Sequence, residues 1–492
     1  MQASEANPKQ VYIFEKAPYL KAILTLALPS ILAQLILVIY NMADTFFIGQ
    51  ASTATFYVDN GLQNALVAGV TICMPLYMIL SAISNLFGIG ASSVMSRSMG
   101  KLDYERARNA SRFAFWGCLA TSIIYCSLVF IFTTPLASFL SGGNPEVMQF
   151  AEIYIRITIV FCGVPTTLNT LLSHLFRAEG KSAHAMFGIM IGGLLNIILD
   201  PLFMFVIFPI EKAAMGAALA TGISNIVALI YFGVCYIVMN KKLVISFKFK
   251  RKMFYNGVPR ECLIIGLPAF LMTLCENVSY MILDNLMGTV STDIVITKAT
   301  LAGVGAAKKI NMFAHSTVRG MTQGVLPLIG YNKTSGNRHR MRRIVYISGG
   351  ISVGIAAICL ILNLFLAPQL SSIFLHETES LKYSATFLKV FSIGAPFSAI
   401  AYTIISFFQA VGKAWRSLIL ALLRKGILDI PLMYILNNFI PIYGIVWATP
   451  IADIICAIVA ILLFIIYIHN HGHDRHASAK YSNIDASLEA NN

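Results

Sequence analysis

An amide, a carboxylate and a proline stand close together inside a long apolar stretch of this chain. Asn196 and Asp200 are four residues apart, so they lie on one face of a helix. Pro201 has no N–H, so we expect the carbonyl of Ile197 to lose its helical partner and the helix to bend there. An aspartate at the centre of a membrane helix costs about 2.5–3.5 kcal/mol. The set resembles a site for a hard cation or a proton; the alternative is a kinked helix whose aspartate bonds locally.

A second polar row lies on the first apolar stretch. Four residues share this face at spacings of 4, 7 and 3: Ser30, Gln34, Asn41 and Asp44. Such a row faces a cavity or another helix and not lipid, although many rows serve only hydrogen bonds between helices. Thr221 adds a hydroxyl within a run of small residues that permits close packing.

The second half of the chain has charges of its own. Glu276 lies on one apolar segment, and His315 and Arg319 are spaced i, i+4 on the next. Glu276 is either an anion in a cavity or an ion-pair partner within its own half. His315 and Arg319 either pair with an acid such as Glu276 or contact a ligand.

The composition is that of a polytopic membrane protein. Of 492 residues, 57% are hydrophobic and 12% are charged, whereas soluble domains carry about 25% charged residues. The first 18 residues are polar, and the apolar run from Tyr19 is too long for a cleavable signal peptide. The nine cysteines show no CxxC spacing, and the histidines of the C-terminal tail lack further ligands, so we expect no disulfide and no metal site.

Twelve membrane helices account for the apolar stretches. Basic residues gather in alternate loops, among them 97–108, the loop carrying Arg177 and Lys181, and 241–257. The opposite loops are nearly free of basic residues, so both termini are expected in the cytoplasm of a plasma-membrane protein. This placement of the +14 net charge argues against nucleic-acid binding. The predicted helix cores are 20–48, 64–96, 106–132, 148–174, 184–207, 214–239, 259–287, 299–328, 342–367, 380–409, 415–438 and 444–468.

Short motifs recur in the same order in the two halves, such as Leu28-Pro29 with Leu267-Pro268 and Pro201-Leu202 with Pro431-Leu432. Six helices return the chain to its starting side, so the repeat is parallel, with a pseudo-twofold axis along the membrane normal. We predict an all-α membrane protein of two six-helix lobes. Its parts are an N-terminal tail (1–18), the N-lobe (19–240), a basic linker (241–257), the C-lobe (258–468) and a C-terminal tail (469–492).

The polar set appears asymmetric under this repeat. Asn196 aligns with Gly426, Asp200 with Ile430 and Asp44 with Leu283. The acid-plus-amide set is therefore expected in the N-lobe alone. Asp44 and Asp200 both fall in the outward halves of their helices, at similar depth, so we predict that they share one cation or proton.

The chain resembles the multidrug and toxic compound extrusion (MATE) family over roughly residues 19–468. The motifs are Ala43-Asp44-Thr45-x-x-Ile48-Gly49, Gly88-x-Gly90-Ala91-Ser92, Arg177-Ala178-x-Gly180, Asn196-x-x-x-Asp200-Pro201 and Gly324-x-x-Pro327-x-Ile329-Gly330-Tyr331-Asn332. The resemblance implies alternating access by two lobes and export of amphipathic, often cationic drugs against inward Na⁺ or H⁺. It implies a cation site of Asp44, Asn196, Asp200 and Thr221. The expected substrate cavity contains Gln34, Asn41, Glu276, His315 and Arg319.

One branch of the family pairs an acid like Glu276 with an acid in the tenth helix, which here has none between Phe387 and Ala410. A complete ion site in the C-lobe is therefore not expected. The closest alternative function is a lipid-linked oligosaccharide flippase of the same superfamily, for which Arg156 and Arg319 are the few candidate pyrophosphate ligands.

An intramembrane enzyme is not expected. No HExxH or GxSxG motif occurs, and the isolated His174 and His315 do not make a catalytic set. We expect a monomeric antiporter for small molecules in the lipid bilayer, with no cofactor other than Na⁺ or H⁺ as the coupling ion.

Overall fold

The first membrane helix begins at Tyr19, as the sequence predicts. The computed structural model describes residues 8–239, 243–291, 293–375 and 377–470. Residues 1–7 and 471–492 of the predicted tails, and residues 240–242 where the N-lobe meets the linker, lie outside the described residues. Ahead of Tyr19, a short segment folds as α1 (Pro8–Val11) and η1 (Tyr12–Lys16).

The N-lobe is built from helices, several of them interrupted. Polar side chains cap some of their first turns, as when Asp103 accepts the backbone N–H of Arg106 at the start of α6. The elements are α2 (Tyr19–Ser52), α3 (Thr55–Asp59), α4 (Gln63–Thr71), α5 (Met74–Gly100), α6 (Tyr104–Ile131), α7 (Thr133–Leu140), α8 (Pro145–Ile155), η2 (Arg156–Phe161), α9 (Gly163–Ala178), α10 (Ser182–Pro201), η3 (Leu202–Ile207), η4 (Ile210–Lys212) and α11 (Ala213–Met239).

A linker containing η6 (Arg251–Phe254) leads to the C-lobe. Asp293 and Asn337 cap the first turns of the two longest C-lobe helices. The C-lobe elements are α12 (Val258–Gly288), α13 (Ile294–Thr334), α14 (Arg338–Ser372), α15 (Thr378–Ala410), α16 (Ala414–Leu422), η7 (Leu423–Leu428), α17 (Asp429–Phe439) and α18 (Tyr443–Asn470).

Most of the predicted spans pass a test of length and apolarity. Nine helices of the described residues are long and apolar enough to cross a membrane, and a tenth span is bent by 51° between Pro145–Phe161 and Gly163–Ala178. Two further rods complete the predicted twelve: α13, and the series α16–η7–α17. Both carry basic residues within the protein, Arg319 in α13 and Arg424 and Lys425 in η7, which lowers their apolarity.

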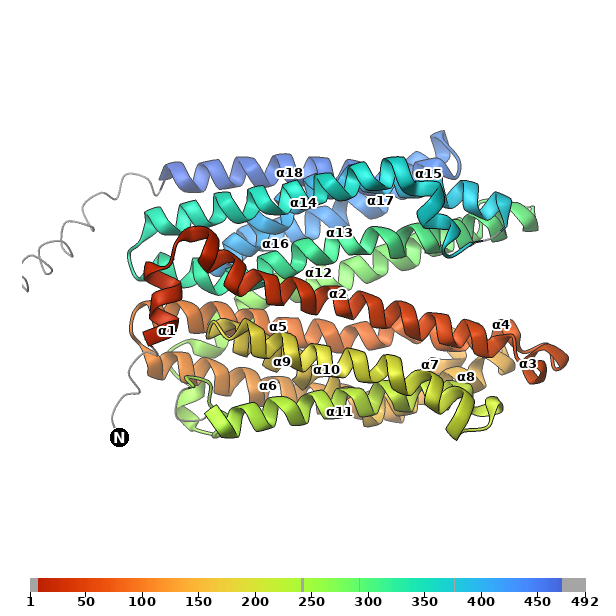
Figure 1. Cartoon of the computed structure of the whole chain (residues 1–492), viewed down its shortest axis with the longest axis horizontal. Coiled ribbons are helices and arrows are strands. Elements are labelled where there is room, and N and C mark those ends of the chain that lie inside the picture. Colours follow the sequence, from red (N-terminus) through yellow and green to blue (C-terminus); the bar gives the residue numbers. More distant parts are fainter. Residues whose placement is uncertain (1–7, 240–242, 292, 376, 471–492) are drawn as a thin grey trace, which may run out of the picture.

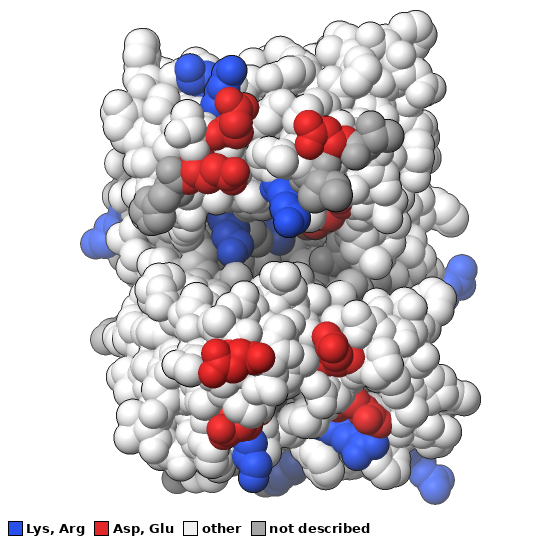
Figure 2. Space-filling model, turned by 90° about the vertical axis from the view of Figure 1, so that its right-hand side faces the viewer, with Lys and Arg blue, Asp and Glu red and all other residues white. Residues whose placement is uncertain are grey.

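The two lobes meet closely at one end and diverge at the other (Figure 1). The chain enters α2 and leaves α18 at the closed end, which also carries the linker element η6, so this end corresponds to the predicted cytoplasmic side. The opposite face is hollowed between the lobes, and acidic side chains are spread over both halves of its rim (Figure 2).

Small residues form the closed seam between the lobes. Gly266 of α12 lies against the backbone of α5, and a Cβ added there would overlap the carbonyl oxygen of Leu86. Gly324 of α13 lies against α2 in the same way, next to Ala27. These two crossings follow the repeat, because α12 stands to α5 as α2 stands to α13. Backbones come this close only where side chains are minimal.

Ion pairs and hydrogen bonds also join the lobes between this seam and the closed end of the molecule. Glu261 of α12 accepts from Arg97 of α5 at 2.7 Å and from Arg106 of α6 at 2.6 Å. The Ser93 hydroxyl donates to the carbonyl of Gln409 at 2.6 Å. The lobes are thus held together at the closed end by close backbone packing, ion pairs and hydrogen bonds.

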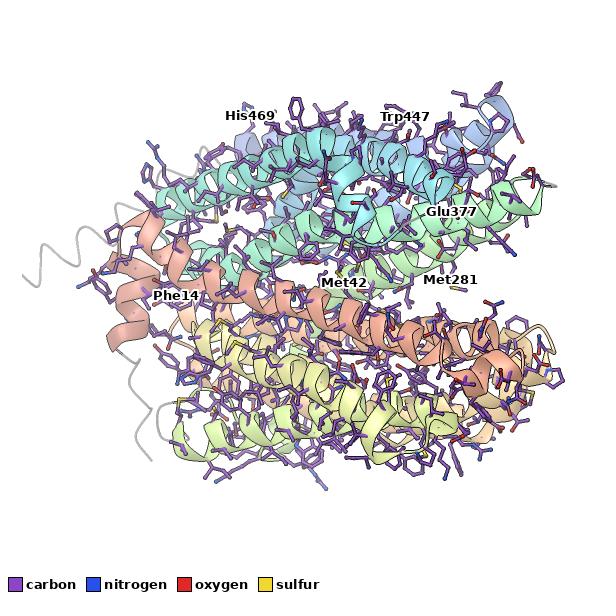
Figure 3. The ribbon with its side chains drawn as sticks, turned by 45° about the vertical axis from the view of Figure 1, so that its right-hand side comes forward. Phe14, Met42, Met281, Glu377, Trp447 and His469 are labelled. Carbon is purple, nitrogen blue, oxygen red and sulfur yellow. The ribbon has the colours of Figure 1, made fainter. Side chains whose placement is uncertain are left out.

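The N-terminal segment η1 lies across this closed end (Figure 3). Phe14 is fully buried, its ring lies 5.0 Å from that of Tyr331, and its carbonyl accepts from Asn332 at 3.0 Å and Arg340 at 2.9 Å. On the other side the Phe14 ring touches the turn at Gly180, which follows α9 of the N-lobe. One phenylalanine therefore fills a space between the two lobes.

Candidate functional site

Three N-lobe helices come together around the predicted acid pair. Gly193 of α10 has no Cβ, which allows α2 to approach until Ile36 and Tyr40 occupy that space. On the other side Gly192 of α10 lies against Ser224 and Ala228 of α11. One turn further along α10 is Asn196, and Asp200 follows, so both enter the space between α2 and α11.

The predicted cation ligands form a buried cluster. Asn196 Nδ2 donates to Asp200 Oδ1 at 3.1 Å and to Thr221 Oγ1 at 3.3 Å, which joins α10 to α11. Asp44 of α2 is 6% exposed and Asp200 is fully buried, and the two carboxyl groups lie near enough to interact electrostatically. The half-buried Lys309 of α13 in the C-lobe also lies within electrostatic range of Asp44.

This cluster holds more acceptors than donors. Three oxygens have no hydrogen-bond donor: Asp44 Oδ1, Asn196 Oδ1 and Asp200 Oδ2. An unmatched buried acceptor costs roughly 1–3 kcal/mol, and more when charged. A proton or a small hard cation supplies what such oxygens lack. The arrangement is therefore suited to binding a proton or a small cation.

Pro201 changes the winding of the helix at this cluster. The regular α-helix ends at Pro201, and Leu202–Ile207 continue as a π-helical segment. Proline has no N–H to donate, which favours an irregularity here, although Ser182–Ile207 still forms one continuous span. Wider π turns at such positions are a frequent feature of functional sites. Leucine, valine and phenylalanine side chains of this segment are largely exposed on the outside of the lobe.

A central cavity of about 220 Å³ lies beside the cluster, between the two lobes. Asn196 and Thr221 line it, whereas Asp44 and Asp200 are not among its lining residues. Tyr40, Tyr77 and several amides complete the N-lobe wall. The lining contains no carboxylate among the described residues, and its basic members are Arg177 and Arg319. The carboxyl groups of Asp44 and Asp200 are thus separated from the cavity by uncharged side chains.

The predicted cavity residues are divided among three positions. Gln34, Asn41 and Arg319 line the central cavity, and Gln34 also donates to Gln323 of α13 at 3.2 Å. Glu276 lines a smaller adjoining hollow of about 60 Å³, where Arg319 donates to it. His315 lines neither space; it lies near the side chains of Asn311 and Ser398. Ser30, from the same row of α2, only donates to its own backbone at Leu26.

The C-lobe also contains buried acids, but their partners are basic residues and hydroxyls and not an amide. Asp429 of α17 accepts from Lys425 at 2.7 Å, Thr449 at 2.9 Å and Ser279 at 2.6 Å. Asp453 of α18 accepts from Arg424 at 2.6 Å. The repeat alignment missed these acids because it compares matching positions only, and Asp429 lies one residue from the position that aligns with Asp200.

The two lobes nevertheless differ in charge balance. The C-lobe acids Glu276, Asp429 and Asp453 each have a basic partner. Ordinary sequence signals could have found this network, because Arg424, Lys425 and Asp429 interrupt a predicted membrane helix. Asp44 and Asp200 of the N-lobe have no ion-pair partner within 4 Å among the described residues.

Two arginines lie elsewhere than the sequence suggested. Arg177, assigned to a cytoplasmic loop, is 2% exposed within α9 and lines the central cavity. Its spacing of three residues from His174, another lining residue, was the available signal. Arg156, considered as a pyrophosphate ligand, points away from the cavity and pairs with Glu152 at 2.6 Å on the exposed side of its helix.

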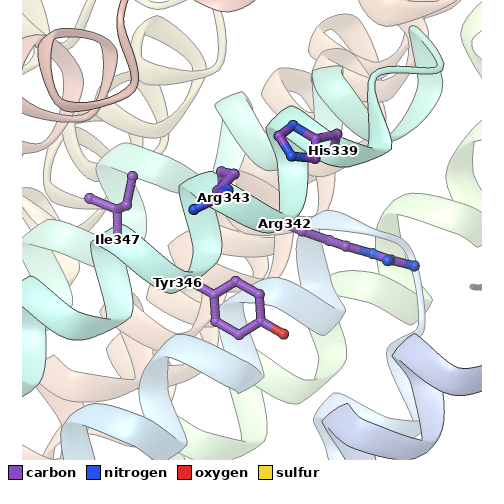
Figure 4. A pocket seen from close by; sticks show the side chains of 5 residues that line it. All are labelled: His339, Arg342, Arg343, Tyr346 and Ile347. Atoms are coloured by element: carbon purple, nitrogen blue, oxygen red, sulfur yellow. The ribbon is translucent and has the colours of Figure 1, made fainter.

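A further hollow of about 480 Å³ lies at the cytoplasmic end of the C-lobe (Figure 4). All of its lining residues come from the first turns of α14: His339, Arg342, Arg343, Tyr346 and Ile347. Because one helix supplies the whole lining, this hollow is a surface groove and not part of the passage between the lobes.

Comparisons with known proteins agree with this architecture. A family model described as MatE matches residues 29–202 and 268–435, which lie in both lobes. Two relatives named "Multidrug export protein MepA" are 28% identical to this chain. The one from Staphylococcus saprophyticus aligns over 456 residues, 92% of this chain and 95% of the relative. The one from Staphylococcus haemolyticus aligns over 463 residues, 93% and 96%.

Among solved structures, an outward-facing conformation of a multidrug resistance MATE family transporter of the MOP superfamily superposes with a TM-score of 0.83. It is 21% identical in sequence, and the superposition covers 95% of this chain and 99% of that one. That likeness establishes the two-lobe fold, and the family model extends over most of both lobes. The chain therefore belongs to the MatE family, the multidrug and toxic compound extrusion transporters that its sequence motifs resemble.

Proposed function

We propose that this protein is a secondary antiporter that exports amphipathic compounds, including cations, in exchange for inward Na⁺ or H⁺. The observation that carries the proposal is the N-lobe cluster, in which three buried oxygens of Asp44, Asn196 and Asp200 have no donor. A protein that binds no cation gains nothing from such a deficit, because each unmatched acceptor lowers its stability. The names of the relatives, multidrug export proteins, support the same activity.

Coupling in this proposal acts through the wall of the cavity. Asn196 and Thr221 both line the cavity, and Asn196 Nδ2 donates to Asp200 and to Thr221 at once, so Asn196 connects the cavity wall to a carboxylate. A cation bound between Asp44 and Asp200 would draw these oxygens together and rearrange the Asn196 amide. The substrate then responds to the ion without contacting it, which is coupling between two distinct sites.

The shape of the protein supplies one step of this proposed exchange. The cytoplasmic seam at Gly266 and Gly324 is closed, and the outer face is hollowed between the lobes (Figure 2). In such a state an ion from outside reaches the N-lobe cluster while a substrate leaves. Reopening on the cytoplasmic side requires the seam and the Glu261 ion pairs to separate.

The test is transport by the purified protein in liposomes. The probe is the ethyl ester of rhodamine B, a fluorescent amphipathic cation, and an inward Na⁺ gradient and an inward proton gradient are imposed separately. We expect one gradient to drive dye movement in the wild-type protein. Asp44→Asn and Asp200→Asn should each reduce this movement to the level seen without a gradient.

The matched control is Asp59→Asn, because Asp59 is an exposed acid of α3 on the outer face. It should transport like the wild type. Gel filtration must show that all variants are folded. Gradient-driven transport by either cluster variant would remove the site assignment, and failure of both gradients to drive dye movement would remove the antiport proposal.

A further inference from the structure

One buried cation of the central cavity lacks a charge partner. Arg177 is 2% exposed and lines the cavity, and no ion pair of the described residues includes it. Arg319, the other arginine of the lining, is satisfied by Glu276 and by the hydroxyl of Tyr402 at 3.0 Å. Burying an ion without a counter-charge lowers the stability of the folded protein by several kcal/mol. A buried Arg177 is therefore expected to have an anionic partner.

The hydrogen bonds of Arg177 leave one edge of its guanidinium free. Nη1 donates to Gln323 Oε1 at 3.1 Å and lies 3.5 Å from His174 Nδ1. Nε and Nη2 have no partner among the described residues. These two atoms carry the parallel N–H pair that matches the two oxygens of a carboxylate. The free edge is therefore the one suited to bidentate binding.

The position of Arg177 within its helix does not replace such a partner. Arg177 is in the last turn of α9, where the helix dipole favours a positive charge. That effect is worth about 0.3–1 kcal/mol at exposed sites and up to about 2 kcal/mol when partly buried, and it supplies no hydrogen bond to Nε or Nη2. The charge is offset only in part.

The surroundings of Arg177 form the cytoplasmic floor of the cavity. Gln323, which accepts from both Arg177 and Gln34, is adjacent to Gly324 of the closed seam. Asn85 and His174 continue this polar floor through their contact at 3.2 Å. Above it, Met78 and Met312 add apolar lining. The cavity thus offers a basic floor, apolar sides and, behind Asn196, two acids.

We propose that the Nε–Nη2 edge of Arg177 binds the carboxylate of a zwitterionic amphipathic substrate. The cationic end of such a substrate would lie toward Asn196, where Asp44 and Asp200 attract it, and the carboxylate would lie on the floor. The inference rests on the proposed function, because it assigns the substrate of the same cavity. It departs from the expectation of a purely cationic substrate.

The experiment compares two probes that differ in one group. Rhodamine B carries a free carboxylate beside its cationic ring system, and in its ethyl ester that carboxylate is capped. Binding of both dyes to the purified wild-type protein in detergent is measured by fluorescence polarisation. We expect the acid to bind more tightly than the ester, and Arg177→Gln to reduce the acid-to-ester affinity ratio about tenfold, the loss expected for one charge-assisted hydrogen-bonded pair.

The matched control is Arg112→Gln. Arg112 is equally buried but lies in α6 outside the cavity, with Glu105 and Asn109 as partners. It should leave the ratio unchanged, whatever it does to stability. Arg177→Lys, which keeps the charge and loses the fork, should give an intermediate ratio.

Two outcomes would overturn the inference. One is equal affinity of the wild-type protein for the ester and the acid. This result does not depend on the folding of any variant. The other is an Arg177→Gln protein, folded by gel filtration, with the wild-type ratio. Neither result touches the antiport proposal, because gradient-driven movement of the ester tests that separately.

Discussion

Asp200 and Asp453 are carboxylates buried to almost the same extent, at 0% and 1% exposure, yet their partners differ. Asp200 Oδ1 accepts from the neutral amide of Asn196, whereas Asp453 Oδ1 accepts from the charged Nε of Arg424 at 2.6 Å. Arg424 also stacks over Tyr402, with its Cζ 4.4 Å from the ring centroid. We therefore assign Asp453 to the stability of the C-lobe and Asp200 to cation binding.

Asp453→Asn should destabilise the protein by about 3–5 kcal/mol, because it leaves Arg424 buried without a counter-charge. Heating in detergent followed by gel filtration measures the loss. The double variant Arg424→Met with Asp453→Leu should recover much of it, since two apolar groups need no compensation. A stable Asp453→Asn protein that no longer responds to an ion gradient would instead place Asp453 in the coupling machinery.

A sequence reveals a candidate site residue when its polar side chain stands within an apolar segment. It does not reveal one whose sequence neighbours are also polar. Asp44, Asn196 and Asp200 stood out because each is polar within an apolar helix, whereas the set that includes Thr221 came from the resemblance to the MATE family. Arg177 was not predictable as a cavity residue. It lies near a run of loop residues, and only the packing of α9 shows that the side chain turns inward.

Helices with interruptions distinguish this fold from a bundle of regular rods. π-Helical turns occur at Arg156–Phe161, Leu202–Ile207 and Leu423–Leu428, in spans that belong to both lobes. Each lies next to a proline: Pro201 precedes Leu202, Pro165 follows Phe161 by four residues, and Pro431 follows Leu428 by three. Because a proline leaves the carbonyl four residues before it without a helical partner, each proline signals an interruption, although a helical period does not reveal its π form. The order and number of the spans were predictable because they depend only on apolar length and loop charge.

The N-terminal segment η1 is expected to hold the cytoplasmic side closed. Phe14→Ala removes a fully buried ring from between the Gly180 turn and Tyr331, at a cost of about 3–5 kcal/mol to the closed state. Spin labels at Leu102 of the N-lobe and Trp415 of the C-lobe, both exposed, should report longer and broader distances across this end.

Tyr12→Ala is the control for that substitution, because Tyr12 lies in the same segment but is 45% exposed. Its distance distribution should match that of the wild type. If Phe14→Ala also leaves the distribution unchanged, the segment does not contribute to closure.

At the scale of the whole molecule, two close crossings related by the repeat hold the lobes together at the closed end. Gly266 with α5 and Gly324 with α2 bring backbones of opposite lobes into contact, and no larger residue fits at Gly266 without moving the Leu86 carbonyl. In the proposed alternating-access cycle, the lobes would move as bodies about a seam that is either closed or parted. This is the two-state element that ion and substrate would bias in opposite directions.

Gly266→Ala should shift the protein away from its outward-facing state and reduce transport at least tenfold. Alanine favours a helix by about 1 kcal/mol over glycine, so any loss must come from the overlap with Leu86 and not from helix propensity. The Leu102–Trp415 spin-label pair measures the opening. Gly354→Ala is the control, because no atom lies within 4 Å of a Cβ at that position. Wild-type transport by Gly266→Ala would show that the seam tolerates a wider spacing.

The neutral screen of Asn196 and Thr221 in front of the two acids also bears on drug resistance. Selection by a new toxic compound acts on the groups that the compound touches, and these are amides, tyrosines, methionines and Arg177. In the proposed mechanism the ion-binding carboxylates of Asp44 and Asp200 lie behind this lining. Under that proposal, substitutions in the lining would broaden the range of exported compounds one at a time without altering the ion site.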